Sequence, residues 1–471
     1  MLKLLQRGYH GKVKMIYIDP PYNTGHDFVY RDSFGDTIEN YKAQAGLGGQ
    51  SNADMSGRYH SDWCSMMYPR LRLARELLTD DGVIFISIDD NEYANLKELC
   101  NEIFGENSFL ATFVWKRRAS SQLDKSKCST DHEYVLAYKG SAFCAFRGVD
   151  KDYKGYSNPD NDPRGPWTTG DLTVGMTGDM RPNQYYDLVD PKTGIKYKPN
   201  YNRVWSYIPE SMNQLIADNR IVFPSDPSKR PMKKRFLSEL DSTTNPQSTW
   251  MDSVGMNTEG TKQMYDLFGK AFFTYTKPVS LVRSLILQAT TRGDIVLDFF
   301  AGSSTTAHAV MQRNLEDGEG RRFILVQLPE ILDASSEANK AGFDTICQIG
   351  EERIRRAGSK IKNELEESNR QLKLGEEPKQ LPDIGFRVFT LDESGIERPE
   401  PGQLVLDVVK PDRTELDIVF EMMLKWGLEL TLPVEKSDAA GYPIWSVACD
   451  ELVCCMSRGL TIGALEAIAN M

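Results

Sequence analysis

KVKMIYIDPPYN, residues 12–23, is the stretch that decides the fold. Residues 13–18 are mostly apolar or β-branched and too few for a helix, so they predict a buried β-strand. The strand ends before Pro20 and Pro21, because proline cannot continue a ladder of backbone hydrogen bonds. Asp19-Pro20-Pro21-Tyr22 therefore lies at the carboxyl end of a strand, which is the ligand-binding edge of an open α/β sheet.

The tetrapeptide carries groups that can activate an aromatic amine. The lone pair of such an amine is delocalised into its ring, so the N–H groups need acceptors that draw the nitrogen towards a tetrahedral geometry. Asp19 offers a carboxylate, and Pro20 fixes the chain so that a nearby carbonyl is the second acceptor. Tyr22 offers a flat face for a base taken out of its stack. A proline-rich turn capped by Asp19 is the simpler alternative.

Composition indicates a large globular protein. The 471 residues are 40% hydrophobic and 26% charged, and this length predicts roughly two to four domains. The eight cysteines include no C-x-x-C pair and no histidine at metal-ligand spacing, so we expect reduced thiols and no metal site. No apolar run has membrane length, and residues 1–12 lack the apolar core of a signal peptide. We expect a cytoplasmic protein that does not bind a membrane.

The charge is unevenly distributed. A net charge of −11 argues against a protein that coats nucleic acid without selectivity. Residues 140–270 are nearly neutral, with 17 Lys and Arg against 16 Asp and Glu. They include five cations in the seven positions 229–235. Such a run is usually a solvated face, but it could also contact phosphates.

Residues 1–139 predict the first half of an α/β domain. Apolar positions recur at helical spacing over 63–78, where Pro69 interrupts the pattern. Residues 83–88 form a nearly continuous apolar strand, and a further helical stripe covers 93–103. Helices alternate with strands, so we expect a parallel sheet.

Two segments predict loops and short strands instead. Residues 140–270 are dense in Asp, Asn, Pro, Gly and Tyr, and they predict a separate module inserted between two α/β halves. Its aromatic side chains could anchor a small core: Trp167, Tyr185, Tyr186, Tyr201 and Trp205. The Gly-rich residues 32–55 predict a loop beside the tetrapeptide.

Residues 271–372 predict the second half of the α/β domain. Residues 294–300 form a strand that runs through a small-residue loop, 301–306, into a helix, and such a loop lets backbone N–H groups approach a ligand. Glu330 follows the next strand, 322–327, where an acid can accept hydrogen bonds from ribose hydroxyls. The combination predicts an adenosine-containing cofactor. The loop is not G-x-G-x-x-G, which argues against a nicotinamide enzyme.

In combination these motifs resemble the β-group amino methyltransferases of DNA. The resemblance rests on Asp19-Pro-Pro-Tyr22 early in the chain, Asp298-Phe-Phe-Ala-Gly302-Ser-Ser-Thr-Thr306 late, and a variable module between them. Longer matches resemble the modification (Mod) subunit of type III restriction systems over nearly the whole chain. They are ISIDDNE at 86–92, NPDNDPRGPW at 158–167, GFRVF at 385–389 and LKWGL at 424–428.

The resemblance implies the fold and its division into domains. It implies a Rossmann-like S-adenosylmethionine-dependent methyltransferase sheet with a circularly permuted order of motifs. Residues 1–139 would be its catalytic half and 271–372 its cofactor-binding half. Residues 140–270 would be a target-recognition module, and 385–471 a small C-terminal α+β domain for contacts with other subunits.

The resemblance also implies a role for each site residue. Asp19, Pro20, Pro21 and Tyr22 would bind and activate a flipped adenine, whose N6 nitrogen would attack the sulfonium methyl of S-adenosylmethionine directly. The cofactor-binding residues would be Lys277, Asp298, Phe300, Gly302, Ser304, Thr305 and, for the ribose, Glu330. No metal is implied, because the leaving group already carries a positive charge.

Two features differ from the family pattern. Family members usually have a strand with a Gly-Asp-Asn signature ahead of Asp-Pro-Pro-Tyr, whereas about twelve residues precede the strand here. We therefore expect either a truncated form or an incomplete cofactor pocket. Ser304 stands where many relatives have glycine, a change that the loop should tolerate.

The sequence thus favours a site-specific N6-adenine DNA methyltransferase that is the modification subunit of a type III restriction-modification system. Asp19 rather than serine before Pro-Pro-Tyr favours adenine over N4 of cytosine, which is one alternative. A truncated or catalytically silent DNA-recognition or scaffolding subunit is another. The expected partners are double-stranded DNA with base flipping, a second copy of the chain in a homodimer, and a restriction subunit with nuclease and helicase activity.

Overall fold

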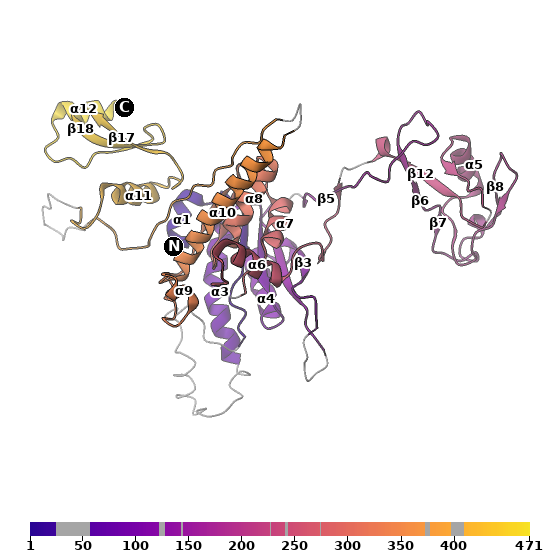
Figure 1. Cartoon of the computed structure of the whole chain (residues 1–471), viewed down its shortest axis with the longest axis horizontal. Coiled ribbons are helices and arrows are strands. Elements are labelled where there is room, and N and C mark those ends of the chain that lie inside the picture. The colour runs from indigo at the N-terminus through magenta and orange to yellow at the C-terminus, as the bar shows by residue number, and fades with distance from the viewer. Residues whose placement is uncertain are drawn as a thin grey trace, which may run out of the picture. The chain divides into compact units, whose positions relative to one another are not determined.

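The computed structural model describes most of the chain (Figure 1). The described residues are 1–24, 57–121, 128–142, 145–226, 228–240, 244–273, 275–372, 377–396 and 409–471. The predicted loop at 32–55 lies outside them. The chain forms two compact units, one of residues 1–147 and 248–471 and the other of residues 148–247.

The first unit is built on a seven-stranded sheet with the order β14-β3-β4-β2-β1-β15-β16. The strands are β1 (Val13–Ile18), β2 (Leu78–Ile88), β3 (Phe109–Lys116), β4 (His132–Lys139), β14 (Trp250–Met251), β15 (Ile295–Asp298) and β16 (Arg322–Leu325). β1 lies between β2 and β15 and is parallel to both. This α/β sheet confirms the predicted fold class.

The sheet is mixed, so the prediction of a parallel sheet was wrong at one strand. β4 is antiparallel to both of its neighbours, β2 and β3. β3 and β4 are consecutive in the chain, and antiparallel neighbours need no crossover connection between them. β3 itself was not predicted, because its half-buried residues show no clear period.

Helices cover both faces of the sheet. Alternate residues of β1 point to opposite sides, so Ile16 and Ile18 pack in one core and Met15 and Tyr17 in the other. The first core contains α1 (Leu2–Tyr9), α3 (Gly57–Leu77) and α4 (Tyr93–Phe104), and the second contains α7 (Val279–Ala289) and α8 (Thr305–Asp317). α3 continues through Pro69, where an interruption was expected.

Further helices flank the half that contains β15. α10 (Ile346–Arg370) runs alongside α8 and packs on it through Ile354, Ala357 and Ile361 (Figure 1). α6 (Asn257–Phe268) and α9 (Glu337–Lys340) share a smaller core with the start of α10. None of the helices in the described ranges combines the length and the apolar character needed to cross a membrane.

The second unit, residues 148–247, has a small core of its own. Its elements are β5 (Val149–Asp150), β6 (Trp167–Gly170), β7 (Thr173–Val174), β8 (Leu188–Val189), β9 (Lys196–Tyr197), β10 (Val204–Trp205), α5 (Pro209–Ala217), β11 (Ile221–Val222), β12 (Met232–Phe236) and β13 (Thr244–Asn245). Trp205 is buried in the core as expected, whereas Tyr201 is 46% exposed. β5 and β13, at the two ends of the unit, pair antiparallel.

The basic run 229–235 of this unit is only partly a solvated face. Lys234 is buried and forms ion pairs with Asp160 and, at 3.2 Å, with Asp162. Lys229 and Arg235 are exposed. Because β12 alternates its side chains between two faces, part of the run neutralises buried acids while the rest faces solvent.

The C-terminal residues form a small α+β arrangement within the first unit. It comprises α11 (Glu415–Trp426), β17 (Val434–Ala439), β18 (Tyr442–Val447), β19 (Leu452–Cys454) and α12 (Ile462–Ala469). The backbone N–H of Leu430 donates to Tyr9 Oη (2.8 Å). Glu429 forms ion pairs with Lys12 (3.1 Å) and Arg322 (2.6 Å).

Gly260→Ala tests how α6 positions the chain that leads into α7. A Cβ at Gly260 would lie 2.1 Å from the carbonyl oxygen of Thr276, so alanine must displace this backbone. We expect a loss of roughly 1–3 kcal/mol in the free energy of unfolding, measured by urea denaturation. Gly463→Ala is the control, because it is also helical but has open space around it and should gain up to about 1 kcal/mol. Equal effects of the two substitutions would contradict the packing of α6.

Candidate active site

The tetrapeptide 19–22 directly follows β1 at the carboxyl edge of the sheet. In the pairing of β1 with β15, Ile16 is opposite Leu297. This parallel register brings the tetrapeptide and the loop that follows β15 to the same edge. Trp63 Nε1 donates a hydrogen bond to the carbonyl oxygen of Pro21 (2.7 Å), so that carbonyl is already engaged.

Asp19 belongs to a network of two acids and two cations. Lys277 Nζ lies 2.9 Å from the carboxylate of Asp19 and 3.3 Å from Oε2 of Glu133. Arg117 Nη1 donates to Oε1 of Glu133 (2.8 Å). Tyr22 Oη lies 2.9 Å from Oδ1 of Asp19 and 3.1 Å from Oε2 of Glu133, so its single proton can serve either acid. The side chain of Asp19 is 27% exposed, whereas those of Lys277 and Glu133 are buried.

The network has a defined charge pattern. Burial would raise the pKa of Glu133, but Lys277 and Arg117 outweigh it and lower this pKa. Burial opposes the charge of Lys277, but Asp19 and Glu133 raise its pKa. Burial raises the pKa of Asp19 against the opposing effect of Lys277. Burial also raises the pKa of Tyr22, so its hydroxyl stays a neutral donor.

Lys277 contacts both predicted motifs. Its ammonium binds Asp19 and lies 4.9 Å from the centroid of the Tyr22 ring. Its backbone carbonyl lies 3.5 Å from Oγ1 of Thr305, the first residue of α8 directly after the loop that follows β15. The ammonium therefore sits at the tetrapeptide, while the backbone borders the second motif.

Two buried acids of the site were missed in the sequence. Glu133 is the second residue of β4 and directly precedes the apolar and aromatic run 134–138, and a buried-looking acid at that place was the available signal. Glu92 is fully buried and accepts hydrogen bonds from Asn23, which has φ +58°, and from Asn95 Nδ2 (2.7 Å). It also lies 2.7 Å from His60 Nδ1. Glu92 thus anchors the residue that follows Tyr22, a role with no signal in the sequence.

The loop after β15 is held by hydrogen bonds from both sides. Asp298 accepts from the backbone N–H of Phe300 (3.1 Å) and from Oγ1 of Thr306 (2.5 Å). Gly302, with φ +49°, donates its N–H to Oε1 of Gln327 (2.7 Å). Phe300 is buried in the core beneath the loop. Burial raises the pKa of Asp298 to about 7.

The other predicted cofactor residues lie around this loop. Ser304 has φ +62° and is buried against Gly350 of α10, where a Cβ would lie 2.5 Å from its Oγ. Thr305 is also buried, and its hydroxyl accepts from Arg353 (2.7 Å). Glu330 lies beyond the end of β16, half-buried, and burial raises its pKa. Arg353 was not identified in the sequence, where it belongs to a charged helical run.

The chemistry of this edge fits S-adenosylmethionine. Gly302 has φ +49°, a backbone conformation that favours glycine, and without a side chain its backbone is open to a ligand. Arg353 has two buried nitrogen atoms, Nε and Nη2, without a hydrogen-bond partner in the described structure. The loop also leads into the N-terminus of α8, which favours anionic groups. Among the described residues, no group of three or more His, Cys, Asp and Glu is arranged to hold a metal ion.

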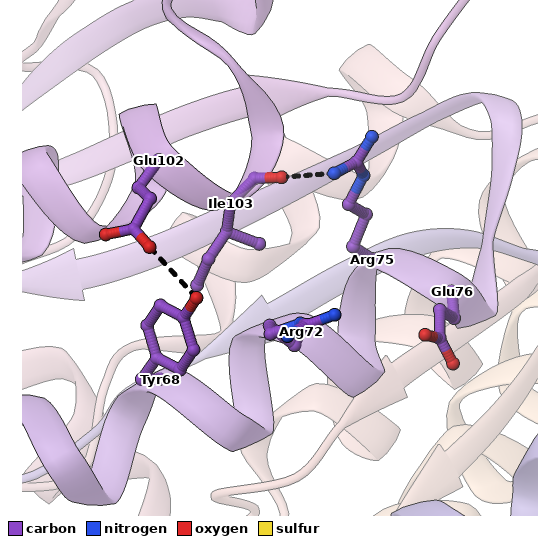
Figure 2. A pocket seen from close by; sticks show the side chains of 6 residues that line it. All are labelled: Tyr68, Arg72, Arg75, Glu76, Glu102 and Ile103. Atoms are coloured by element: carbon purple, nitrogen blue, oxygen red, sulfur yellow. Dashed lines mark hydrogen bonds between the residues drawn. The ribbon is translucent and has the colours of Figure 1, made fainter.

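Two cavities between α3 and α4 lie apart from these groups. One, of about 450 Å³, is lined by Tyr68, Arg72, Arg75, Glu76, Glu102 and Ile103. Figure 2 shows that Tyr68 bonds to Glu102 (2.9 Å) and Arg75 to the carbonyl of Ile103 (2.5 Å). The other, of about 430 Å³, is lined by Cys64, Asn95, Glu98, Leu99, Asn101, Glu102 and Glu106. Neither is lined by the tetrapeptide or by the loop after β15.

Comparison with known proteins gives consistent results. A family described as DNA methylase matches residues 13–331. The Mod subunit of the type III restriction-modification enzyme StyLTI from Salmonella typhimurium is 41% identical over 77% of this chain. The EcoP15I Mod subunit from Escherichia coli is 31% identical over 99% of this chain. The chain spans 56% of the length of the Salmonella protein and 76% of that of the Escherichia coli protein.

Similarity to solved structures is more distant. The PvuII DNA methyltransferase, described as cytosine-N4-specific, is 12% identical with a TM-score of 0.32. The match covers 76% of this chain and 89% of that protein.

Asp298→Asn tests the buried carboxyl of the loop. Because burial raises the pKa of Asp298 to about 7, the folded protein keeps this group protonated between about pH 4 and pH 7, where the unfolded chain ionises it. The free energy of unfolding of the parent protein should therefore fall as pH rises through this interval. The Asp298→Asn variant should not show the decrease that comes from Asp298, because its side chain does not ionise. Relative to the parent, the variant should gain roughly 2–4 kcal/mol between pH 4 and pH 8.

Urea denaturation at a series of pH values measures this difference. Asp266→Asn, at an exposed position of α6, is the control and should leave the profile unchanged. Parallel profiles for the parent and Asp298→Asn would show that the Asp298 carboxyl is ionised in the folded protein.

Proposed function

This chain belongs to the DNA methylase family, and from that premise we propose that it transfers a methyl group from S-adenosylmethionine to the N6 amino group of adenine in DNA. The proposal includes a role as the modification subunit of a type III restriction-modification system in the cytoplasm. The observation that carries it is the contact between the Asp19 carboxylate and the Lys277 ammonium (2.9 Å), beside the loop after β15. In the proposed complex the amino group of the target base would take the place of the Lys277 ammonium beside Asp19, since both are nitrogen atoms that donate hydrogen bonds.

Asp19 and Tyr22 would hold the target base. Asp19 is the accessible acid of the network and would accept a hydrogen bond from the adenine amino group, which draws the lone pair out of the ring. Tyr22 would stack on the base that has left the helix. The carbonyl of Pro21 is engaged by Trp63, so the carbonyl of Pro20 is the better second acceptor.

Lys277 would have to release Asp19 when the base arrives. Glu133 lies 3.3 Å from the same ammonium, and Arg117 holds Glu133 in place (2.8 Å). Glu133 would therefore keep Lys277 charged and nearby while Asp19 changes partner. The cofactor, when bound, supplies an activated methyl group on a positively charged sulfur, and residues 298–305 with Glu330 would hold it.

The other parts of the chain would serve recognition and assembly. The unit 148–247, within the predicted 140–270, would be the target-recognition module that contacts double-stranded DNA. Residues 1–139 and 271–372 would be the two halves of the methyltransferase domain. Residues 385–471 would contact a second copy of the chain or a restriction subunit. The similarity to Mod subunits supports the role as a modification subunit.

Two alternative functions can be distinguished from this proposal by a methylation experiment. N4 of cytosine is also an exocyclic amine on a flat ring, so the described network would bind it by similar contacts. A catalytically silent recognition or scaffolding subunit would bind DNA without methylating it. Asp19 rather than serine at the head of the tetrapeptide favours adenine.

Asp19→Asn should abolish methylation while the protein still binds the cofactor. The amide keeps the size of the side chain but loses the negative charge that accepts from the amine and pairs with Lys277. We expect a fall of at least about 100-fold in transfer of labelled methyl from S-adenosylmethionine to plasmid DNA, corresponding to roughly 3 kcal/mol. Asp266→Asn is the matched control at an exposed acid.

Nucleoside analysis of the DNA separates the alternatives. Detection of N6-methyladenine would support the proposal. Detection of N4-methylcytosine instead would show that the target base is cytosine and not adenine. If the parent protein methylates neither base, the silent alternative stands.

Lys229→Ala and Arg235→Ala test the role of residues 148–247. Both side chains are exposed, so their loss should weaken DNA binding through phosphates without unfolding the unit. Each substitution should reduce the dependence of log affinity on log salt by about one unit for any DNA sequence, measured by fluorescence anisotropy. Lys362→Ala, on α10, is the control. An unchanged salt dependence would argue against this basic run as a DNA contact.

A further inference from the structure

Arg353 of α10 supports the loop after β15 from behind. Its side chain is fully buried, and Nη1 donates to Ser303 Oγ (2.7 Å), to Thr305 Oγ1 (2.7 Å) and to the carbonyl oxygen of Ser303 (3.3 Å). α10 approaches this loop closely, because a Cβ at Gly350 would lie 2.5 Å from Ser304 Oγ. One guanidinium therefore sets the orientation of two hydroxyl groups in the predicted cofactor loop.

The charge of Arg353 is not balanced within the described structure. No carboxylate among the described residues forms an ion pair with it, and its Nε and Nη2 are buried without partners. Burial lowers its pKa to about 9. Burial, followed by Arg353 and Lys360, also lowers the pKa of the neighbouring His308 to about 3, so His308 is neutral. A buried cation without a counter-charge is costly, and a nearby anion would relieve the cost.

The hydrogen bonds from Arg353 also determine what the loop can bind. Arg353 has no acceptor atom, so Ser303 and Thr305 must accept from it. The protein acceptors near the Thr305 hydroxyl are the Lys277 carbonyl oxygen and Ser303 Oγ, each 3.5 Å away, which is too long for a strong hydrogen bond, so the hydroxyl protons can turn to a ligand. Their oxygen atoms are 3.5 Å apart, so both donors lie at one place. The N-terminus of α8, which begins at Thr305, adds a partial positive charge there. All three features favour an anion.

We propose that Arg353 is a positioning residue for the carboxylate of the cofactor, acting through the hydroxyls of Ser303 and Thr305. This inference rests on the proposed function, because S-adenosylmethionine carries a carboxylate on its methionine part. Arg353 holds both hydroxyls as donors towards this carboxylate, and its charge balances that of the carboxylate across the loop. Recognition of the cofactor therefore extends to α10, the helix that packs behind the loop.

The test compares two ligands that differ in one group. Isothermal titration of the full chain with S-adenosylmethionine and with decarboxylated S-adenosylmethionine measures how strongly the carboxylate is preferred. The parent protein should prefer the carboxylated ligand by about 10- to 100-fold. Arg353→Met should lose most of this preference while its affinity for the decarboxylated ligand changes by less than about 2-fold, and Arg353→Lys should retain part of it.

Matched variants separate positioning from folding. Thr305→Val keeps Arg353 in place and removes one donor, so it should reduce the preference even if Arg353→Met does not fold. Arg355→Met, at an exposed position of the same helix, should change neither affinity. An equal loss of both affinities in Arg353→Met and Thr305→Val, or a parent without preference, would overturn the inference while leaving cofactor binding intact. A parent that binds neither ligand would overturn the proposed function as well.

Discussion

The parallel pairing of β1 with β15 is the constraint on which the rest of the site depends. It places residues 19–22 and the loop after residue 298 at one edge of the sheet, although the whole second unit lies between them in the chain. Backbone hydrogen bonds and a core on each face hold the two strands in register, with Ile16 opposite Leu297. A slip of one residue would turn these side chains to the wrong face, so the register of the site is strongly determined.

The pairing of β1 with β15 also positions the charge network around Asp19. Lys277 and Arg117 compensate the acids Asp19 and Glu133 in a place where burial alone would favour their neutral forms. Asp19 is the most exposed of the four charged members, and in the proposed reaction it would meet the substrate amine. The buried members hold its geometry, so in the proposed reaction Asp19 would exchange one nitrogen partner for another without a new binding arrangement having to form.

The loop after β15 is held in place by residues of α10 and of the segment that follows β16. α10 contributes Arg353 to the hydroxyls of the loop, and Gly350 allows the helix to lie directly on Ser304. The segment that follows β16 contributes Gln327 to the N–H of Gly302. The loop is thus held in a conformation that includes left-handed backbone at Gly302 and Ser304, which local sequence alone would not maintain.

The sequence by itself determined the strands on both sides of the site, the tetrapeptide at the end of β1 and the small-residue loop after β15, because these depend on local periodicity and on proline and glycine. Only the tertiary structure decided the reversal of β4, the contact of Lys277 with Asp19, and the roles of Glu133, Glu92 and Arg353. A charged residue in a sequence does not indicate whether it will be exposed or paired. Its role is decided by distant partners, such as Asp19 for Lys277, 258 residues away, which folding brings within hydrogen-bond distance.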